Sequence, residues 1–112
     1  MVRMASRSEM LPGTLDMLIL KTLTLGSMHG YGIAQRIQQI SGEVLQVEEG
    51  SLYPALQRLM VNGWVKAQWG ASENNRRARF YTLTAAGRKK LGDEVRSFNE
   101  TIAGILRVLE TA

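Results

Sequence analysis

The basic side chains of this 112-residue chain are concentrated in one stretch. Between residues 58 and 90 there are eight basic residues and one acid, Glu73, a formal charge of +7, whereas the rest of the chain carries −3. The eight are Arg58, Lys66, Arg76, Arg77, Arg79, Arg88, Lys89 and Lys90. Guanidinium and ammonium groups at this density are typical of phosphate contacts. The stretch therefore predicts a surface that meets a polyanion, with DNA as the first partner to consider.

Residue patterns for other chemistry are missing from the sequence. Cysteine is absent, which excludes disulfides, a thiol nucleophile and cysteine-based metal sites. His29 is the single histidine and has no cluster of carboxylates near it in the sequence, so we expect it to stabilise a turn rather than bind a metal. Nucleophile–base pairs, phosphate-cradling glycine loops and paired catalytic carboxylates are missing too. We expect no enzyme activity, no metal and no cofactor.

A two-faced helix directly precedes the basic stretch, and we expect Ser51 to cap it and Pro54 to lie in its first turn. Its buried stripe consists of Leu52, Leu56, Leu59 and Met60. The side chains that point outward or sideways near its N-terminal half are Ser51, Tyr53, Gln57 and Arg58. Gln and Arg can pair with adenine and guanine edges, and Ser and Tyr hydroxyls suit phosphate oxygens. The pattern favours a DNA-recognition helix over an ordinary solvated face.

A β-hairpin with a basic tip follows this helix. Alternating residues predict a strand at 65–69, a polar loop at 70–75 and a second strand at 80–83. Arg76, Arg77 and Arg79 lie at or beside the tip, where they suit phosphates and narrow minor grooves. The alternative is a solubilising loop. Arg79 shares strand parity with Tyr81, so we expect its stem to be partly buried, and we expect Trp69 to pack on the preceding helix.

The order of elements predicts a mainly α chain with a small β-hairpin, that is, a winged helix-turn-helix with an added C-terminal helix. We expect residues 1–10 to form an N-terminal arm, residues 11–84 to form the DNA-binding domain and residues 85–112 to form a dimerisation helix. Thr14 is expected to cap the first helix, a second helix ends near Ser41, and residues 44–47 could be a short strand. The longest apolar stretch, residues 15–25, is too short to span a bilayer. We expect a soluble, cytoplasmic protein without a membrane partner.

The last helix carries a heptad-like apolar seam. Its members, spaced by 4, 3, 4, 3 and 4 residues, are Leu91, Val95, Phe98, Ile102, Ile105 and Leu109. Such spacing is typical of helices that pack against another helix. Because the domain before it already has a core, we expect the seam, with Leu15 and Leu18 of the first helix, to form a homodimer interface. The alternative is a helix that folds back on its own domain.

Several blocks of the sequence, taken in order, resemble the PadR family of bacterial transcriptional regulators over residues 11–91. These blocks are Leu15-Asp16-Met17-Leu18-Ile19-Leu20, His29-Gly30-Tyr31-Gly32-Ile33, Gly50-Ser51-Leu52-Tyr53-Pro54-Ala55-Leu56, Gly63-Trp64-Val65 and Phe80-Tyr81-Thr82-Leu83-Thr84-Ala85-Ala86-Gly87. The resemblance implies a winged-helix repressor that dimerises through its C-terminal region, here of the short subfamily. It also implies that Ser51, Tyr53 and Pro54 begin the recognition helix and that Tyr31 lies near the DNA backbone.

The resemblance leaves the effector open. Some short-subfamily members bind flat aromatic compounds between subunits, using a tryptophan on the last helix, whereas here Phe98 is the only aromatic residue of that helix. A small-molecule effector at the dimer interface therefore stays undefined. The leading hypothesis is a dimeric repressor that binds a palindromic double-stranded DNA operator and is nucleoid-associated when bound. There are two rival hypotheses. The first is a protein–protein module whose basic hairpin binds an acidic partner. The second is a small RNA-binding protein, although RNA readers usually show aromatic stacking platforms.

Overall fold

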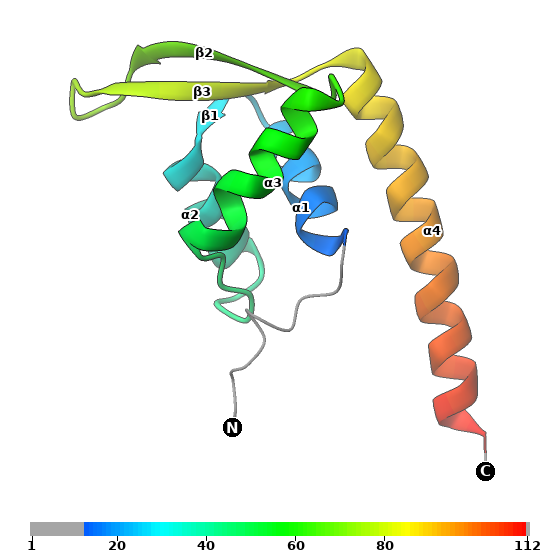
Figure 1. Ribbon diagram of the computed structural model, residues 1–112. Helices are drawn as coiled ribbons and strands as arrows, with labels where there is room; N and C mark the ends of the chain where they lie inside the picture. The colour runs from blue at the N-terminus through cyan, green and yellow to red at the C-terminus, as the bar shows by residue number, and fades with distance from the viewer. Residues whose placement is uncertain (1–12, 112) are drawn as a thin grey trace.

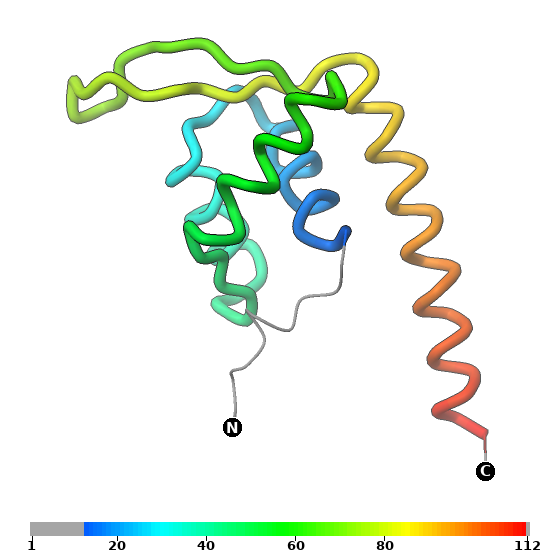
Figure 2. Tube along the Cα trace, viewed as in Figure 1, coloured from blue at the N-terminus to red at the C-terminus, as the bar shows by residue number. Residues whose placement is uncertain are grey.

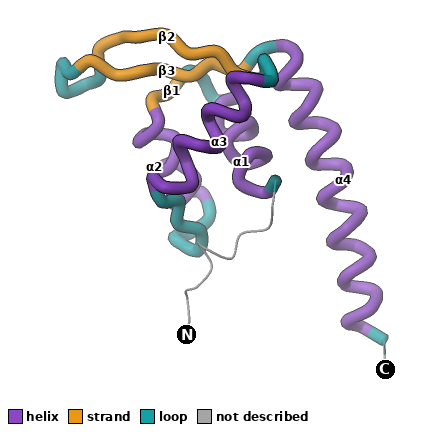
Figure 3. Tube along the Cα trace, viewed as in Figure 1, coloured by secondary structure: helices purple, strands orange, loops and turns teal. Residues whose placement is uncertain are grey.

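The computed structural model describes residues 13–111, which form four helices and a three-stranded sheet. The elements are α1 (Thr14–Leu23), β1 (Met28–His29), α2 (Gly30–Ile40), α3 (Glu49–Val61), β2 (Val65–Ala71), β3 (Arg77–Leu83) and α4 (Ala85–Glu110). Helices α1, α2 and α3 lie together below the sheet, while α4 runs along one side and away from them (Figures 1 and 3). This mainly helical arrangement with a small sheet and a long C-terminal helix confirms the predicted winged-helix fold.

The core lies where α1, α2 and α3 meet under the sheet. Its largest fully buried side chains are Ile19, Leu20, Ile33, Leu52, Leu56 and Leu59. Val65 and Tyr81 close it from the sheet side. Each buried Leu or Ile contributes about 1.5–3 kcal/mol of transfer free energy, so the apolar stripes of the three helices hold α3 in place.

The sheet has one strand that the sequence did not predict. All pairs are antiparallel in the order β1-β3-β2, and β1 contributes only Met28 and His29, opposite Tyr81 and Phe80. His29 was expected to stabilise a turn, and its Nδ1 does accept a hydrogen bond of 3.1 Å from the Gly32 backbone N–H at the start of α2. A strand of two residues has no alternation to detect, so sequence patterns could not separate it from a turn.

Two helix starts differ from the predictions. Gly13, with φ +85°, is the N-cap of α1, and Thr14 is its first helical residue. Helix α3 begins at Glu49, with Glu48 rather than Ser51 at the N-cap. Pro54 consequently lies in the second turn of α3 instead of the first. The preference of serine for caps is a local signal. Here the cap lies three residues further back, and the Glu49 carboxylate in the first turn suits the positive end of the helix dipole.

Residues 44–47 form no strand, which corrects the prediction of one. They belong to the loop between α2 and α3, where Leu45 and Val47 pack against the core while Val44 is exposed. Apolar and polar residues do alternate here, but the apolar side chains anchor a loop, because no strand lies beside this segment to pair with it. The predicted arm, residues 1–10, lies outside the described residues. Within residues 13–111 no helix is long and apolar enough to cross a membrane.

Helix α4 begins at a tight junction. The Thr84 hydroxyl accepts a 3.0 Å hydrogen bond from the Gly87 N–H and donates one of 2.7 Å to the Gly63 carbonyl. Gly87 lies so close to the Trp64 carbonyl that a Cβ at this position would collide with it. The start of α4 is thereby fixed against the end of α3 and the start of β2.

We expect Gly87→Ala to destabilise the protein by about 1–3 kcal/mol, because the new methyl group must displace backbone rather than a flexible side chain. Gly92→Ala, on the same helix with no atom within 4 Å of the added Cβ, is the matched control. It should stabilise the protein by about 0.5–1 kcal/mol through helix propensity. Urea unfolding measures both variants. Equal effects would show that the α4 junction is not tightly packed.

Candidate nucleic-acid interface

One face of α3 is free of the core. At 100° per residue, the side opposite Leu52, Ala55 and Leu56 is centred on four exposed positions. These are Gly50, Pro54, Gln57 and Val61. Ser51, Tyr53 and Arg58 are also exposed, at the edges of this face. Gln57 is the one of the four central residues that can both donate and accept hydrogen bonds with its side chain, which is what contact with a base edge requires.

The earlier start of α3 changes where its predicted contact residues lie. Ser51, Tyr53 and Pro54 are in the N-terminal half of the 13-residue helix, as predicted. Gln57 and Arg58, however, lie in its C-terminal half. Gly50 has no side chain, so the backbone of α3 can approach another molecule closely at its N-terminal end.

Arg58 forms an ion pair that the sequence did not reveal. Its Nη2 donates to Asp16 Oδ1 at 2.8 Å, and its Nε is 3.5 Å from Oδ2, which joins α3 to α1. The hydrogen bond to Asp16 raises the pKa of Arg58. With its side chain 57% exposed, the pair contributes about 0–1 kcal/mol to stability. Because the guanidinium fork is occupied, contact between Arg58 and guanine would require this pair to open.

Two exposed tyrosines lie beside the start of α2. Tyr53 is packed against Gly30, where an added Cβ would lie 2.8 Å from the tyrosine hydroxyl oxygen. Burial, followed by the nearby Glu49 carboxylate, raises the pKa of Tyr53, so its hydroxyl stays protonated and can donate to a phosphate oxygen. Tyr31 is 65% exposed. Both rings line a cleft of about 370 Å³ that also contains Trp69 and Arg79 of the hairpin.

The hairpin is longer than predicted and extends well beyond the helices (Figure 2). Strands β2 and β3 pair from Val65↔Leu83 to Ala71↔Arg77, which leaves residues 72–76 as the tip. Arg76 and Arg77 are exposed, and Arg79 is half-buried with its Nη2 3.7 Å from the Met60 sulfur. The partly buried stem expected for Arg79 is confirmed.

Trp69 corrects a further prediction. It was expected in the hairpin core on α3, but its side chain is 56% exposed. The core extends along β2 only through Val65 and Ala67, and Trp69 lies two residues beyond. The Arg77 guanidinium carbon instead lies 4.5 Å from the centre of the Trp69 ring. Alternation along a strand identifies its inner face, but not where the helix beneath that face ends.

The seam on α4 is divided between two environments. Leu91 is buried, and Phe98, Leu15 and Leu18 pack against the core of the same chain. Ile102 is half-buried, whereas Val95, Ile105 and Leu109 are exposed. Leu106 and Val108, which the heptad pattern missed, are exposed as well. Leu91 and Phe98 thus fix α4 to its own domain, and from Ile105 onward the helix presents apolar side chains that this domain does not cover.

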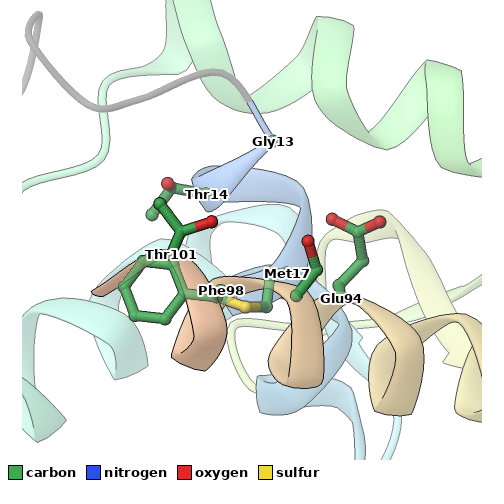
Figure 4. Close-up of a pocket in the computed structure, with 7 residues that line it drawn as sticks. Gly13, Thr14, Met17, Glu94, Phe98 and Thr101 are labelled. Carbon is green, nitrogen blue, oxygen red and sulfur yellow. The ribbon is translucent and has the colours of Figure 1, made fainter. Parts of the chain in front are cut away.

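A small cleft lies between the start of α1 and α4. Its volume is about 160 Å³, and Figure 4 shows Met17, Phe98 and Glu94 among the side chains that line it. Phe98 is the single aromatic ring among the seven lining residues. Within one subunit the cleft therefore lacks the second aromatic face that would hold a flat molecule by stacking.

These features define a winged-helix DNA-binding protein: an exposed helix face, two exposed tyrosines and a basic hairpin around one cleft. Residues 19–93 match the Transcriptional regulator PadR-like family, and the chain belongs to it. A solved transcriptional regulator from Clostridium thermocellum has a TM-score of 0.78 and 30% identity, covering 85% of this chain and 92% of that one. A PadR family regulator from Clostridium difficile has a TM-score of 0.72 and 25% identity, covering 87% and 99%.

Two relatives are similar in sequence but carry no described function. An uncharacterised protein from Lysinibacillus sphaericus is 29% identical over 94 residues, which is 84% of this chain and 86% of that protein. An uncharacterised 37.1 kDa transposon protein from Streptomyces fradiae is 40% identical over 97 residues. That match covers 87% of this chain but 26% of the longer protein. Family membership makes this chain a DNA-binding transcriptional regulator rather than an enzyme.

Gln57→Ala tests the outward face of α3. We expect it to weaken binding to the preferred site by about 1–3 kcal/mol and to affect random DNA much less, because a base contact is lost while phosphate contacts remain. Fluorescence anisotropy with both duplexes measures the difference. Val61→Ala, one turn further along the same exposed face, is the control, because its apolar side chain cannot hydrogen-bond to a base edge. Equal losses on both duplexes would make Gln57 a backbone contact.

Proposed function

We propose that this regulator is a homodimeric repressor that binds a palindromic operator. Helix α3 enters the major groove, and the wing, residues 65–83, lies on the neighbouring backbone or in the minor groove. The observation that carries the proposal is the cleft on which α2, α3 and the wing converge through Tyr31, Tyr53 and Arg79. A single DNA duplex placed against this face meets all three elements at once.

The contacts divide by the chemistry of the side chains. Gln57 reads a base edge, and Tyr31, Ser51 and Tyr53 contact phosphate oxygens through their hydroxyl groups. Pro54 packs against the DNA backbone without donating a hydrogen bond, because proline has no backbone N–H. Arg76 and Arg77 bind phosphates, and Arg79 supports them from its half-buried position. Arg58 joins the interface once its pair with Asp16 opens.

The exposed second half of α4 supports the dimer. Isolated surface residues are common, but Ile105, Leu106, Val108 and Leu109 lie together on two successive turns. Pairing of this segment with its copy removes the apolar surface from water and fixes two recognition helices at a set spacing. Half-sites one helical turn apart, about 34–36 Å, are the geometry such a dimer reads. Repression then needs only that the bound dimer occupy the promoter.

Replacing Arg76 and Arg77 by alanine tests the wing. Binding to specific and random DNA should weaken alike, and the slope of log K against log salt should become shallower by about 2, one unit for each lost phosphate contact. Stability should hardly change, because both side chains are exposed. The control is replacement of Arg96 and Arg107, which lie on α4 outside the wing. If the change in slope is specific to the wing, the control variant should keep the wild-type slope of log K against log salt. An unchanged slope in the wing variant would remove the wing from the interface.

Ile105→Glu tests the dimer. A carboxylate in the exposed seam is either buried without a partner or splits the subunits, at a cost of several kcal/mol in either case. Analytical ultracentrifugation should give a dimer for the wild type and a monomer for the variant. Ala103→Glu introduces the same charge on the other side of α4 and should leave the dimer intact.

Operator binding and repression should follow the oligomeric state. DNA fragments retained by the wild type supply the operator, and a reporter gene placed behind it should be repressed by the wild type and released by Ile105→Glu. A wild-type monomer at micromolar concentration would contradict the proposal. An Ile105→Glu protein that keeps full operator affinity would also contradict it. Because the substitution changes no residue of the proposed DNA-facing surface, a loss of affinity reports on the dimer.

A further inference from the structure

An exposed tryptophan stands among the arginines of the wing. Trp69 is 56% exposed, although nearly every other large side chain of the wing's inner face is at least half-buried. Leaving an indole ring in water forgoes the free energy of its burial, so its place on this surface calls for a reason. Two cationic groups lie over the ring. The guanidinium carbons of Arg77 and Arg79 lie 4.5 Å and 5.9 Å from its centre.

The strand register creates this stack. Trp69 on β2 is directly opposite Arg79 on β3, and Arg77 lies on β3 two residues nearer the hairpin tip. All three side chains therefore share one face of the hairpin. Tyr81, two residues on in the other direction, also lies 5.9 Å from the Arg79 guanidinium. Along this face Arg77 is nearest the tip, Trp69 and Arg79 lie side by side, and Tyr81 follows. Arg76 lies in the tip and has no such ring contact within residues 13–111.

The stacked face is also the face of the cleft. Trp69 and Arg79 line it together with Tyr31 and Tyr53, the side that rests on DNA in the proposed function. A free arginine side chain has many rotamers and loses that freedom when it binds a phosphate. A guanidinium already held over an aromatic ring has lost part of that freedom beforehand.

We propose that Trp69 is a positioning residue of the DNA interface, which holds Arg77 and Arg79 ready for adjacent phosphates. The proposal rests on the proposed DNA-binding mode, because it needs the wing at the duplex. It assigns a role to a residue without charge, so its loss should weaken DNA binding without removing any phosphate contact.

The test compares Trp69→Ala, Trp69→Phe, Arg77→Ala and the double variant Trp69→Ala/Arg77→Ala on one duplex over a range of salt concentrations. Trp69→Ala should lower affinity roughly 5- to 30-fold, the range expected for cation–ring contacts that become shielded from water. Its slope of log K against log salt should match the wild type, whereas Arg77→Ala should make the slope shallower by about 0.9. Trp69→Phe should recover most of the affinity because it keeps an aromatic face.

The double variant separates positioning from direct contact. If Trp69 acts through Arg77, Trp69→Ala should cost clearly less on the Arg77→Ala background than on the wild type. Equal costs on both backgrounds would overturn the proposal, since they would mean that the ring contacts DNA itself or only supports the fold. Wild-type affinity of Trp69→Ala would overturn it too. Unfolding curves of all variants identify any loss that is due to stability.

A second measurement does not depend on removing Trp69. Trp64→Phe leaves Trp69 as the only tryptophan, so its emission reports on the stack directly. Arg77→Ala on this background should shift the emission, and DNA should change it less once Arg77 is gone. Unaltered emission after loss of Arg77 would contradict the stack. If Arg77→Ala leaves the salt slope unchanged, the proposed DNA-binding mode fails and this inference with it. A shallower slope with a neutral Trp69→Ala defeats this inference alone.

Discussion

Helix α3, the wing and the long helix α4 all meet at one hydrogen-bonded junction. Gly63, with φ +76°, turns the chain from α3 into β2, and its carbonyl accepts from the Thr84 hydroxyl that also caps α4. The Thr84 N–H donates to the Trp64 carbonyl at 3.1 Å, and Gly87 lets α4 approach the same carbonyl. The direction of α4 is therefore set by the residues that end α3. In the proposed dimer, the spacing of two such helices is fixed through this point.

The basic stretch that dominates the sequence is not one basic surface. Arg58 is paired with Asp16, and Lys89 and Lys90 are paired with Asp93 and Glu94 one turn along α4. Arg76 and Arg77 have no ion pair within residues 13–111, and they lie at the tip of the hairpin. In the proposed DNA-binding mode, a duplex meets the local charge of the wing rather than the formal total. Charges already paired within the protein add little to its attraction for phosphate.

Sequence patterns identified the helices because each one buries a long apolar stripe, and they identified the wing because its strands alternate. They failed where a structure depends on few residues or on distant ones. The two residues of β1 are too few to show a period, and the pair between Arg58 and Asp16 joins positions 42 residues apart. Trp69 has the alternation of a core residue, but the core ends before it. The positions of Ser51, Tyr53, Arg76 and Arg77 on exposed surfaces could be predicted because each depends on its own element.

In the proposed dimer, the two halves of the α4 seam couple folding to assembly. Leu91 and Phe98 join α4 to the core of its own chain, whereas Ile105 and Leu109 remain exposed about two and three turns beyond Phe98. From Phe98 to Glu110 the helix rises about 18 Å, so a rotation of roughly 10° at Phe98 moves its end by about 3 Å. The cleft beside Gly13 and Phe98 lies at the point where such a rotation begins. In the proposed dimer, the packing of α4 on α1 beside this cleft would therefore influence the spacing of the two α3 helices.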